Sequence, residues 1–234
     1  MPLSSICYAL GYGTGLAAFW WMARRRGLDT PGVMTILLAG LLGALVCANV
    51  LQWVCSGSPG KTILGGVAGG YLSVIAVKSY LGIRRPLGDL FAVAASAGEA
   101  VGRWGCYYGG CCYGRPSHVP WAIWQYGCFR HPTQLYLSAG SALILCLLLW
   151  LDRSHQPENM LFFEQGLLFC LLRFVVEHFR AHDGLTLGLS LAQWACAAGA
   201  IFFAFKIRQL SNHHREPAVT LKLEAEFAPS SVRS

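Results

Sequence analysis

The segment from Gly102 to Arg115, GRWGCYYGGCCYGR, combines arginine, cysteine and glycine between two hydrophobic stretches of the chain. Arginine stays charged and offers planar, paired donors that suit a phosphate, and a deprotonated cysteine is a nucleophile or a metal ligand. Glycines permit positive φ and close approach of the backbone to a bound group. The segment therefore predicts a tight loop around an anion, and a re-entrant loop with a purely structural purpose is the alternative. The glycines concerned are Gly102, Gly105, Gly109, Gly110 and Gly114.

Two further groups of polar residues interrupt apolar sequence later in the chain. Arg173 and Glu177 are four residues apart, so they share one helix face and can form an ion pair, and Arg180 follows one turn later. The stretch RHPTQLY opens another apolar run and supplies Arg130, His131, Gln134 and Tyr136. Both groups fall at the ends of hydrophobic segments, where a site at a membrane surface would need them.

Arg103 and Arg173 are the principal candidates for an anion site. An ionisable side chain inside a membrane span costs a few kcal/mol or more, so it normally faces a partner or a wet cavity. Both arginines have apolar sequence on one side. Two guanidiniums at one membrane face predict a clamp for a phosphate, and a lipid headgroup is the nearest abundant phosphate. For Arg130 and Arg180, snorkelling to the interface is an equally good interpretation.

The elements that would position these residues are hydrophobic helices. Charged residues make up 12% of the 234 residues, about half the share in soluble domains. The composition predicts an all-α integral membrane protein with seven transmembrane helices, each crossing about 30 Å of hydrocarbon. In this prediction 1–206 form one transmembrane domain and 207–234 a polar, disordered tail. The predicted spans are 4–22, 31–54, 62–82, 87–105, 132–151, 160–178 and 186–206.

Basic residues predict the orientation of these helices. Ten of the eighteen lysines and arginines follow the first, third, fifth and seventh spans, and so occupy alternate connections. By the positive-inside rule these connections face the cytoplasm, which places the N-terminus outside and the C-terminus in the cytoplasm. The loop 106–130 then lies outside. Topology and attraction to the membrane surface account for the net charge of +7, so we expect no nucleic-acid partner.

Three blocks of sequence resemble the prolipoprotein diacylglyceryl transferase family, in order and over roughly 60–206. The resemblance implies a seven-span, multi-pass enzyme of the bacterial plasma (inner) membrane. It implies transfer of the diacylglyceryl group of phosphatidylglycerol to the lipobox cysteine thiol of lipoprotein precursors, with membrane lipid around it and with no metal and no cofactor. The blocks are DLFAVAASAGEAVGRWGCYYGGCCYGR, RHPTQLY, and RFVVEHFRAHD followed by LGLSLAQW.

The family's signature loop reads Gly-Arg-x-Gly-Asn-Phe-x-Asn-Gly-Glu-x-x-Gly, and the segment from Gly102 to Gly114 matches it at the glycines and the arginine. The resemblance implies that Arg103 and Arg173 are catalytic: they bind the phosphate and stabilise charge on the departing glycerol phosphate. Glu177, also catalytic, orients Arg173. The implied substrate-binding residues are Gly102, Gly105, Cys106, Cys111, Gly114, Arg130, His131, Gln134, Tyr136 and Arg180. The third block also matches at Asp183, Ser190 and Gln193.

The chain departs from the family where the acceptor thiol would be activated. Cys106, Gly109 and Cys111 replace the two asparagines and the glutamate of the signature, and Leu64 replaces a histidine often proposed as the base. Lys61 lies near that histidine's place and is a basic headgroup contact, a desolvated base or an interfacial anchor. A thiol of ordinary pKa already supplies a little thiolate at neutral pH, so the reaction does not require that base.

The chemistry of the cysteines in the outer loop stays open at this stage. An oxidising compartment permits a disulfide, for example from Cys128 to Cys111 or Cys112. A zinc site that includes His131 lacks the two-plus-two ligand spacing. A thiol whose pKa is lowered by nearby arginines would serve as nucleophile or acyl acceptor, and plain packing is the fourth interpretation. The loop cysteines are Cys106, Cys111, Cys112 and Cys128.

Two alternative functions follow from these departures. A relative without the signature asparagines and glutamate would pass the lipid-derived group to a different acceptor. A non-catalytic protein would bind phospholipid or respond to redox conditions through Cys111 and Cys112. Incubation with phosphatidylglycerol and a lipobox peptide separates these alternatives from transfer to the lipobox.

Overall fold

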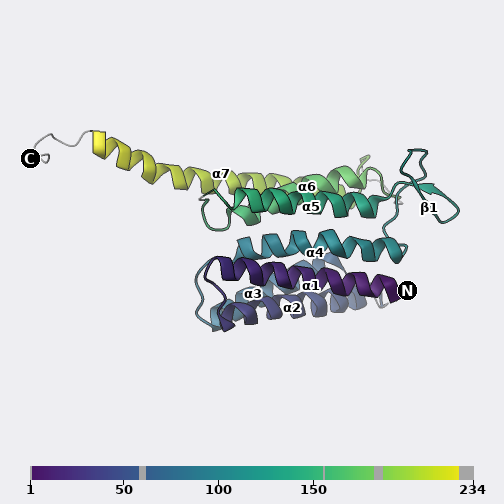
Figure 1. Ribbon diagram of the computed structural model, residues 1–234, viewed down its shortest axis with the longest axis horizontal. Coiled ribbons are helices and arrows are strands. Elements are labelled where there is room, and N and C mark those ends of the chain that lie inside the picture. Colours follow the sequence, from purple (N-terminus) through teal and green to yellow (C-terminus); the bar gives the residue numbers. More distant parts are fainter. Residues whose placement is uncertain (1, 58–61, 155, 182–186, 227–234) are drawn as a thin grey trace, which may run out of the picture. The chain divides into compact units, whose positions relative to one another are not determined.

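The computed structural model describes 2–57, 62–154, 156–181 and 187–226 (Figure 1). In this part of the chain each predicted apolar segment coincides with one helix, which confirms the all-helical architecture, with one short hairpin added. Two helices are long and apolar enough to cross a membrane, over Pro31–Val54 and Thr133–Leu151. The elements are α1 (Pro2–Arg25), α2 (Pro31–Ser56), α3 (Ile63–Tyr80), α4 (Gly88–Tyr108), β1 (Ile123–Gln125), β2 (Cys128–Arg130), α5 (Thr133–Leu151), α6 (Met160–Glu177) and α7 (Leu191–Glu226).

Two helices end later than predicted in ways that matter for the site and the tail. α4 continues to Tyr108, three residues past the predicted end at 105, and so includes Cys106. α7 continues to Glu226, whereas the sequence analysis placed a disordered tail from 207. The structure therefore describes 207–226 as helix, while 227–234 lie outside the described residues. The division into a transmembrane domain and a tail stays a prediction.

The chain forms two compact units. The first comprises 1–15 and 87–234, and the second comprises 16–86. All the residues predicted to form the site lie in the first unit, apart from the positions of Lys61 and Leu64 in the second. Lys61 and the side chain of Leu64 lie outside the described residues.

In the second unit, α2 and α3 pack closely because glycines remove the side chains between them. A Cβ added at Gly69 would lie 2.4 Å from the carbonyl oxygen of Gly43, and one at Gly65 would lie 2.4 Å from that of Cys47. Such contacts are possible only without a side chain, and small residues four apart favour this approach in lipid. Threonine side chains cap both helices: Thr30 accepts from the N-terminus of α2 and Thr62 from that of α3.

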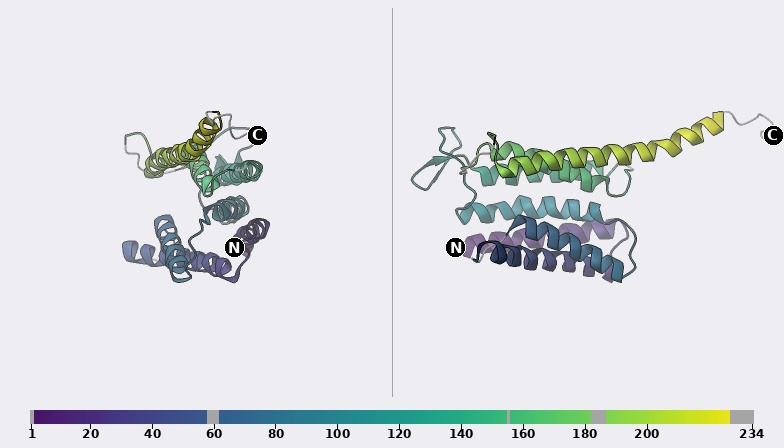
Figure 2. Two further views of the ribbon diagram at one scale, coloured as in Figure 1. Left: turned by 90° about the vertical axis from the view of Figure 1, so that its left-hand side faces the viewer. Right: turned by 180° about the vertical axis from the view of Figure 1, so that it is seen from behind.

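In the first unit, α4 packs against α5 and α6, and α6 packs against α7. Figure 2 shows α5, α6 and the start of α7 grouped beside α4. The beginning of α1 approaches α4 through glycine as well: a Cβ at Gly11 would lie 2.7 Å from the Cα of Gly102. The hairpin of β1 and β2 connects α4 to α5 at one end of these helices (Figure 1).

Polar side chains fix the starts of α6 and α7. Asp89 is buried and its two carboxylate oxygens accept from the backbone N–H groups of Asn159 and Phe162, at 3.1 and 3.2 Å. Ser190 and Gln193 form a reciprocal capping box at the start of α7, with bonds of 2.9 and 3.2 Å. Because each cap joins groups that would otherwise be buried without partners, it sets where its helix begins.

The glycine contacts predict opposite effects for one substitution at two positions. Gly69→Ala places a methyl group 2.3 Å from the Cβ of Cys47, so it should lower the free energy of unfolding by about 1–3 kcal/mol. Gly13→Ala is the matched control: it is helical and meets nothing within 4 Å, so alanine should raise stability by up to about 1 kcal/mol. Thermal unfolding in detergent micelles measures both. Equal effects at the two positions would contradict the close approach of α2 and α3.

Candidate active site

The last turns of α4 carry the first arginine of the candidate site. The Nε of Arg103 donates to the Oε1 of Glu99 at 2.8 Å, and its Nη2 makes a second contact with the same oxygen. The two side chains are about one-fifth exposed and lie one helical turn apart. The charge of Arg103 also acts on the thiols of Cys106 and Cys112. Snorkelling to the interface was an alternative for Arg103 too, and the structure instead gives its guanidinium a carboxylate partner in Glu99.

The end of α6 carries two more arginines around one buried carboxylate. The Oε2 of Glu177 lies 2.8 Å from the Nη2 of Arg173 and 3.3 Å from the Nη1 of Arg180. The positive charges of Arg103 and Arg180 both act on Arg173, so the three guanidiniums are within electrostatic range of one another. Among the described residues, the buried Nη1 of Arg173 has no hydrogen-bond partner. That nitrogen is a donor in need of an acceptor.

The loop after α4 is held against α6 by its backbone. Gly114 forms an antiparallel bridge with Arg180, and the N–H of Arg115 donates to the carbonyl of Phe179 at 2.9 Å. A Cβ at Gly114 would lie 2.4 Å from the carbonyl oxygen of His131, so only glycine fits. Glycine is therefore needed at position 114 because the backbone of His131 lies so close, and not because the residue adopts a positive φ.

The predicted use of positive φ is correct for one signature glycine and wrong for the others. Gly110 has a φ of 67°. Gly102 and Gly105 lie inside α4, where Gly105 allows the ring of Tyr8 to approach: a Cβ would lie 2.8 Å from it. A Cβ at Gly102 would meet nothing within 4 Å, so that side of α4 is open. The physical reason for the difference is that the helix continues through the first half of the signature.

Two buried side chains at the start of α5 fix the cysteine pair. The Oγ1 of Thr133 donates to the carbonyl of Cys112 at 2.7 Å, and the Nε2 of Gln134 donates to that of Cys111 at 2.8 Å. Both side chains are fully buried. Cys112 takes a φ of 59°, the left-handed region that non-glycine residues rarely adopt. The two hydrogen bonds hold the backbone in this strained turn.

The turn gathers three thiols. The sulfurs of Cys106, Cys111 and Cys112 lie within 4.8 Å of one another. The hydroxyl of Tyr8 donates to the sulfur of Cys106 at 3.4 Å and lies 3.8 Å from that of Cys111. A hydrogen bond with Cys106 and burial raise the pKa of the Cys112 thiol. Cys128 belongs to β2 and is not part of this group.

The remaining predicted residues lie towards the hairpin. The guanidinium of Arg130 stacks over the ring of Tyr113 at 5.0 Å and donates to the carbonyls of Gln125 and Gly114, at 3.1 and 3.3 Å. The Nδ1 of His131 lies 3.1 Å from the hydroxyl of Tyr136. Burial and the charge of Arg115 lower the pKa of His131. Arg130 is thus occupied with the loop backbone.

The structure brings some predicted residues together and separates others. Arg103, Arg173 and Arg180 gather near Cys106 and Cys112. Among the described residues, no hydrogen bond or ion pair joins His131 or Tyr136 to Arg103 or Arg173. Asp183 lies outside the described residues.

Sequence reasoning missed two contributors to the site. Thr133 lies in the RHPTQLY block, so its place in that block was an available signal. Tyr8 is 98 residues from its partner Cys106, and nothing in its surroundings in the sequence marks it.

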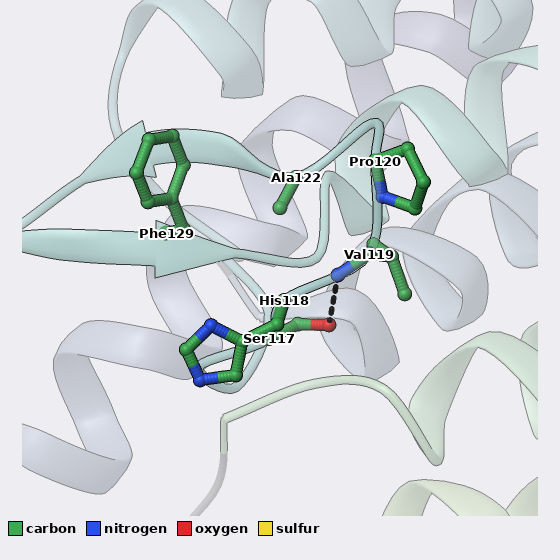
Figure 3. Close-up of a pocket in the computed structure, with 6 residues that line it drawn as sticks. All are labelled: Ser117, His118, Val119, Pro120, Ala122 and Phe129. Atoms are coloured by element: carbon green, nitrogen blue, oxygen red, sulfur yellow. Dashed lines mark hydrogen bonds between the residues drawn. The ribbon is translucent and has the colours of Figure 1, made fainter.

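A pocket of about 270 Å³ lies beside the hairpin, lined by Ser117–Pro120 with Ala122 and Phe129 (Figure 3). Within this lining, the hydroxyl of Ser117 accepts from the N–H of Val119 at 3.3 Å. None of the predicted catalytic or substrate-binding residues lines this pocket. The arginine and thiol groups are therefore a separate feature of the first unit.

Comparisons with known proteins agree on one family. The family model for prolipoprotein diacylglyceryl transferase matches residues 2–207. The chain is 32% identical to the phosphatidylglycerol–prolipoprotein diacylglyceryl transferase of Aromatoleum aromaticum, covering 93% of this chain and 94% of that one. It is 36% identical to the protein of that name from Finegoldia magna, covering 78% and 80% of the two chains. For the one from Geobacter sulfurreducens the identity is 32%, with 75% and 78% covered.

Because Glu177 pairs with two arginines, we expect the loss of its charge to destabilise the protein strongly. Glu177→Gln preserves shape but leaves two arginines without their counter-ion, so the free energy of unfolding should fall by about 3 kcal/mol or more. Asp29→Asn removes one partner of an exposed ion pair with Arg24 and should change it by less than about 1 kcal/mol. Denaturant unfolding in micelles compares the two. A Glu177→Gln protein as stable as the wild type would show that the arginines do not depend on this carboxylate.

Proposed function

Because the chain belongs to the prolipoprotein diacylglyceryl transferase family, we propose that it transfers the diacylglyceryl group of phosphatidylglycerol to the lipobox cysteine thiol of lipoprotein precursors. Relatives covered over most of their length carry this activity in their names. The observation that carries the proposal is the buried Nη1 of Arg173, which has no hydrogen-bond partner among the described residues and lies near two further guanidiniums.

The arginines suit the phosphate of the lipid donor. Arg103, Arg173 and Arg180 carry three positive charges, and Glu99 and Glu177 supply two negative ones. The remaining single positive charge matches the single negative charge of a phosphodiester. A phosphate oxygen would satisfy the Nη1 of Arg173, and charge-assisted bonds of this kind are about twice as strong as neutral ones.

The same arginines favour the bond-breaking step. The acceptor sulfur attacks the glyceryl carbon that bears the phosphate oxygen, so a C–S bond forms while the C–O bond breaks and its electron pair leaves with the glycerol phosphate. The leaving phosphate gains a second negative charge as this happens. Arg103 and Arg173 are already fixed by Glu99 and Glu177, so they stabilise that charge without reorganising.

The other predicted residues position the arginines and the loop rather than stabilising the charge on the phosphate. Glu177 orients Arg173 and Arg180, and Gln134 holds the loop that carries Cys111. Arg130, stacked on Tyr113, shapes the loop rather than reaching the phosphate. His131, near Tyr136, borders the lipid-binding region on the hairpin side.

We place the seven helices across the bacterial inner membrane, with the N-terminus outside and the C-terminus in the cytoplasm. The apolar helices and the family make the chain a membrane protein, and the alternation of basic connections supports this orientation. The arginine and thiol groups then lie at the outer boundary, where phosphatidylglycerol headgroups and exported precursors meet. The 207–234 segment lies in the cytoplasm in this arrangement.

Substitution of the two arginines tests the phosphate clamp. Arg103→Ala and Arg173→Ala should each lower transfer to a lipobox peptide by about 100-fold or more, because each removes a fixed donor to the developing charge. Lysine at either position should rescue poorly, since it lacks the planar fork. Arg153→Ala, at an exposed position after α5, is the control and should retain activity. Near-normal transfer by either alanine variant would refute the clamp, and peptide-independent headgroup release would indicate a different acceptor.

Thiol labelling in intact cells tests the orientation. In a cysteine-free variant, His118→Cys should react with a membrane-impermeant maleimide, because the loop 106–130 faces outward. Arg25→Cys should react only after lysis, because the first basic cluster faces the cytoplasm. Both positions are exposed in the structure, so burial does not confound the comparison. The reverse pattern would invert the topology.

A further inference from the structure

The three thiols at the end of α4 form a compact donor set. The sulfurs of Cys106, Cys111 and Cys112 lie within 4.8 Å of one another. Zn–S bonds of about 2.3 Å place sulfurs in a tetrahedral zinc site about 3.8 Å apart. The observed spacing is therefore within reach of metal binding through small side-chain rotations. Thiolates are the ligands that zinc and other soft ions prefer.

The backbone around this set is built to hold it. Cys112 is kept at a φ of 59°, a strained conformation that persists only where the surrounding structure fixes the turn. The fixing groups are the buried side chains of Thr133 and Gln134, each bonded to a cysteine carbonyl. The turn allows the two consecutive cysteines to join Cys106, although neighbouring side chains in extended backbone point apart.

Two arginines lie within electrostatic range of the sulfurs, although a hydrogen bond with Cys106 and burial raise the pKa of the Cys112 thiol. Arg103 acts on Cys106 and Cys112, and Arg180 acts on Cys112 as well. The hydroxyl of Tyr8 donates to the sulfur of Cys106. Three thiolates in an apolar setting repel one another unless cations offset their charge, and both the arginines and a metal ion would do so.

We propose that Cys106, Cys111 and Cys112 bind one Zn²⁺ through three thiolates and leave its fourth coordination position to the thiol of the acceptor. In the described part of the chain the group has three members, the ligand number of catalytic zinc sites with one open position. The exposure of Cys111 leaves a route for an incoming thiol. The role of the ion rests on the transfer proposed above, whereas its binding does not.

The proposed step is balanced without any change of oxidation state. The acceptor thiol binds Zn²⁺ and loses its proton to water, because a thiol coordinated to zinc is deprotonated. The bound sulfur forms the C–S bond with the glyceryl carbon, and the C–O electron pair leaves on the phosphate. The product is a thioether, a far weaker ligand than a thiolate, so it departs from the ion. The metal thus supplies the activation of the thiol.

Metal content and spectroscopy test the site independently of activity. The full-length protein, purified with a phosphine reductant, should contain about one zinc per chain, and Cys111→Ser should reduce this to below about a tenth. Cobalt substitution should give a thiolate-to-metal charge-transfer band in the wild type only. Cys128→Ser is the matched control, since that thiol lies in β2 outside the group, and it should keep both zinc and spectrum. Thr133→Val should weaken zinc binding about 10- to 100-fold through the loosened turn.

The outcomes separate the site from the proposed transfer. Zinc-free wild type overturns the site. Copper bound in place of zinc overturns the identity of the ion. Normal transfer by the chelated protein overturns the role of the ion, whereas bound zinc without any transfer leaves the site standing and refutes the transfer. Loss of transfer on chelation, restored by zinc, supports both.

Discussion

The carboxylate of Glu177 pairs with two guanidiniums in a place with little access to water, and this constraint shapes the surrounding structure. Burying an ion costs several kcal/mol unless its partners are close and well oriented. Arg173 contacts the carboxylate of Glu177 from the same face of α6, and Arg180 contacts it from just beyond the end of that helix. The loop after α4 then pairs with Arg180 through Gly114, which brings the thiols to the arginines. The ion pairs and the loop therefore depend on one another.

A second constraint acts on the backbone between Cys111 and Gly114. The turn at Cys112 is strained, and the side chains that maintain it belong to α5, whose own start is set by the loop that precedes it. Gly114 leaves no room for a side chain against His131. In a loop fixed from α5 and α6 in this manner, Gly114 allows close approach of the backbone, whereas Gly110 supplies a positive φ.

Residue spacing predicted those contacts of the site that join residues close together in the sequence. The pairing of Arg173 with Glu177 follows from a separation of four residues on a helix, and the apolar runs indicated where the helices lie. The Arg103–Glu99 pair has the same spacing. The contacts of Tyr8 with Cys106 and of Thr133 with Cys112 are invisible to such reasoning, because they join segments whose approach depends on the whole fold. The continuation of α4 from its predicted end at 105 to Tyr108 was missed, because the glycines around this stretch indicate a loop by composition.

Under the two proposals the reaction moves one negative charge from the thiols to the arginines. A zinc ion with three protein thiolates and the acceptor thiolate carries a charge of −2, and the phosphodiester beside it carries −1. After transfer the zinc site has lost one thiolate and carries −1, while the departing phosphate monoester carries −2. The sum is unchanged, so the barrier depends on where positive charge is placed. In this scheme Arg103 and Arg173 face the phosphate that gains the negative charge. Glu99 and Glu177 hold these arginines in place, and together with Arg180 the five side chains keep a net charge of +1. Such an arrangement favours the charge distribution of the product side, which is the distribution that the transition state approaches.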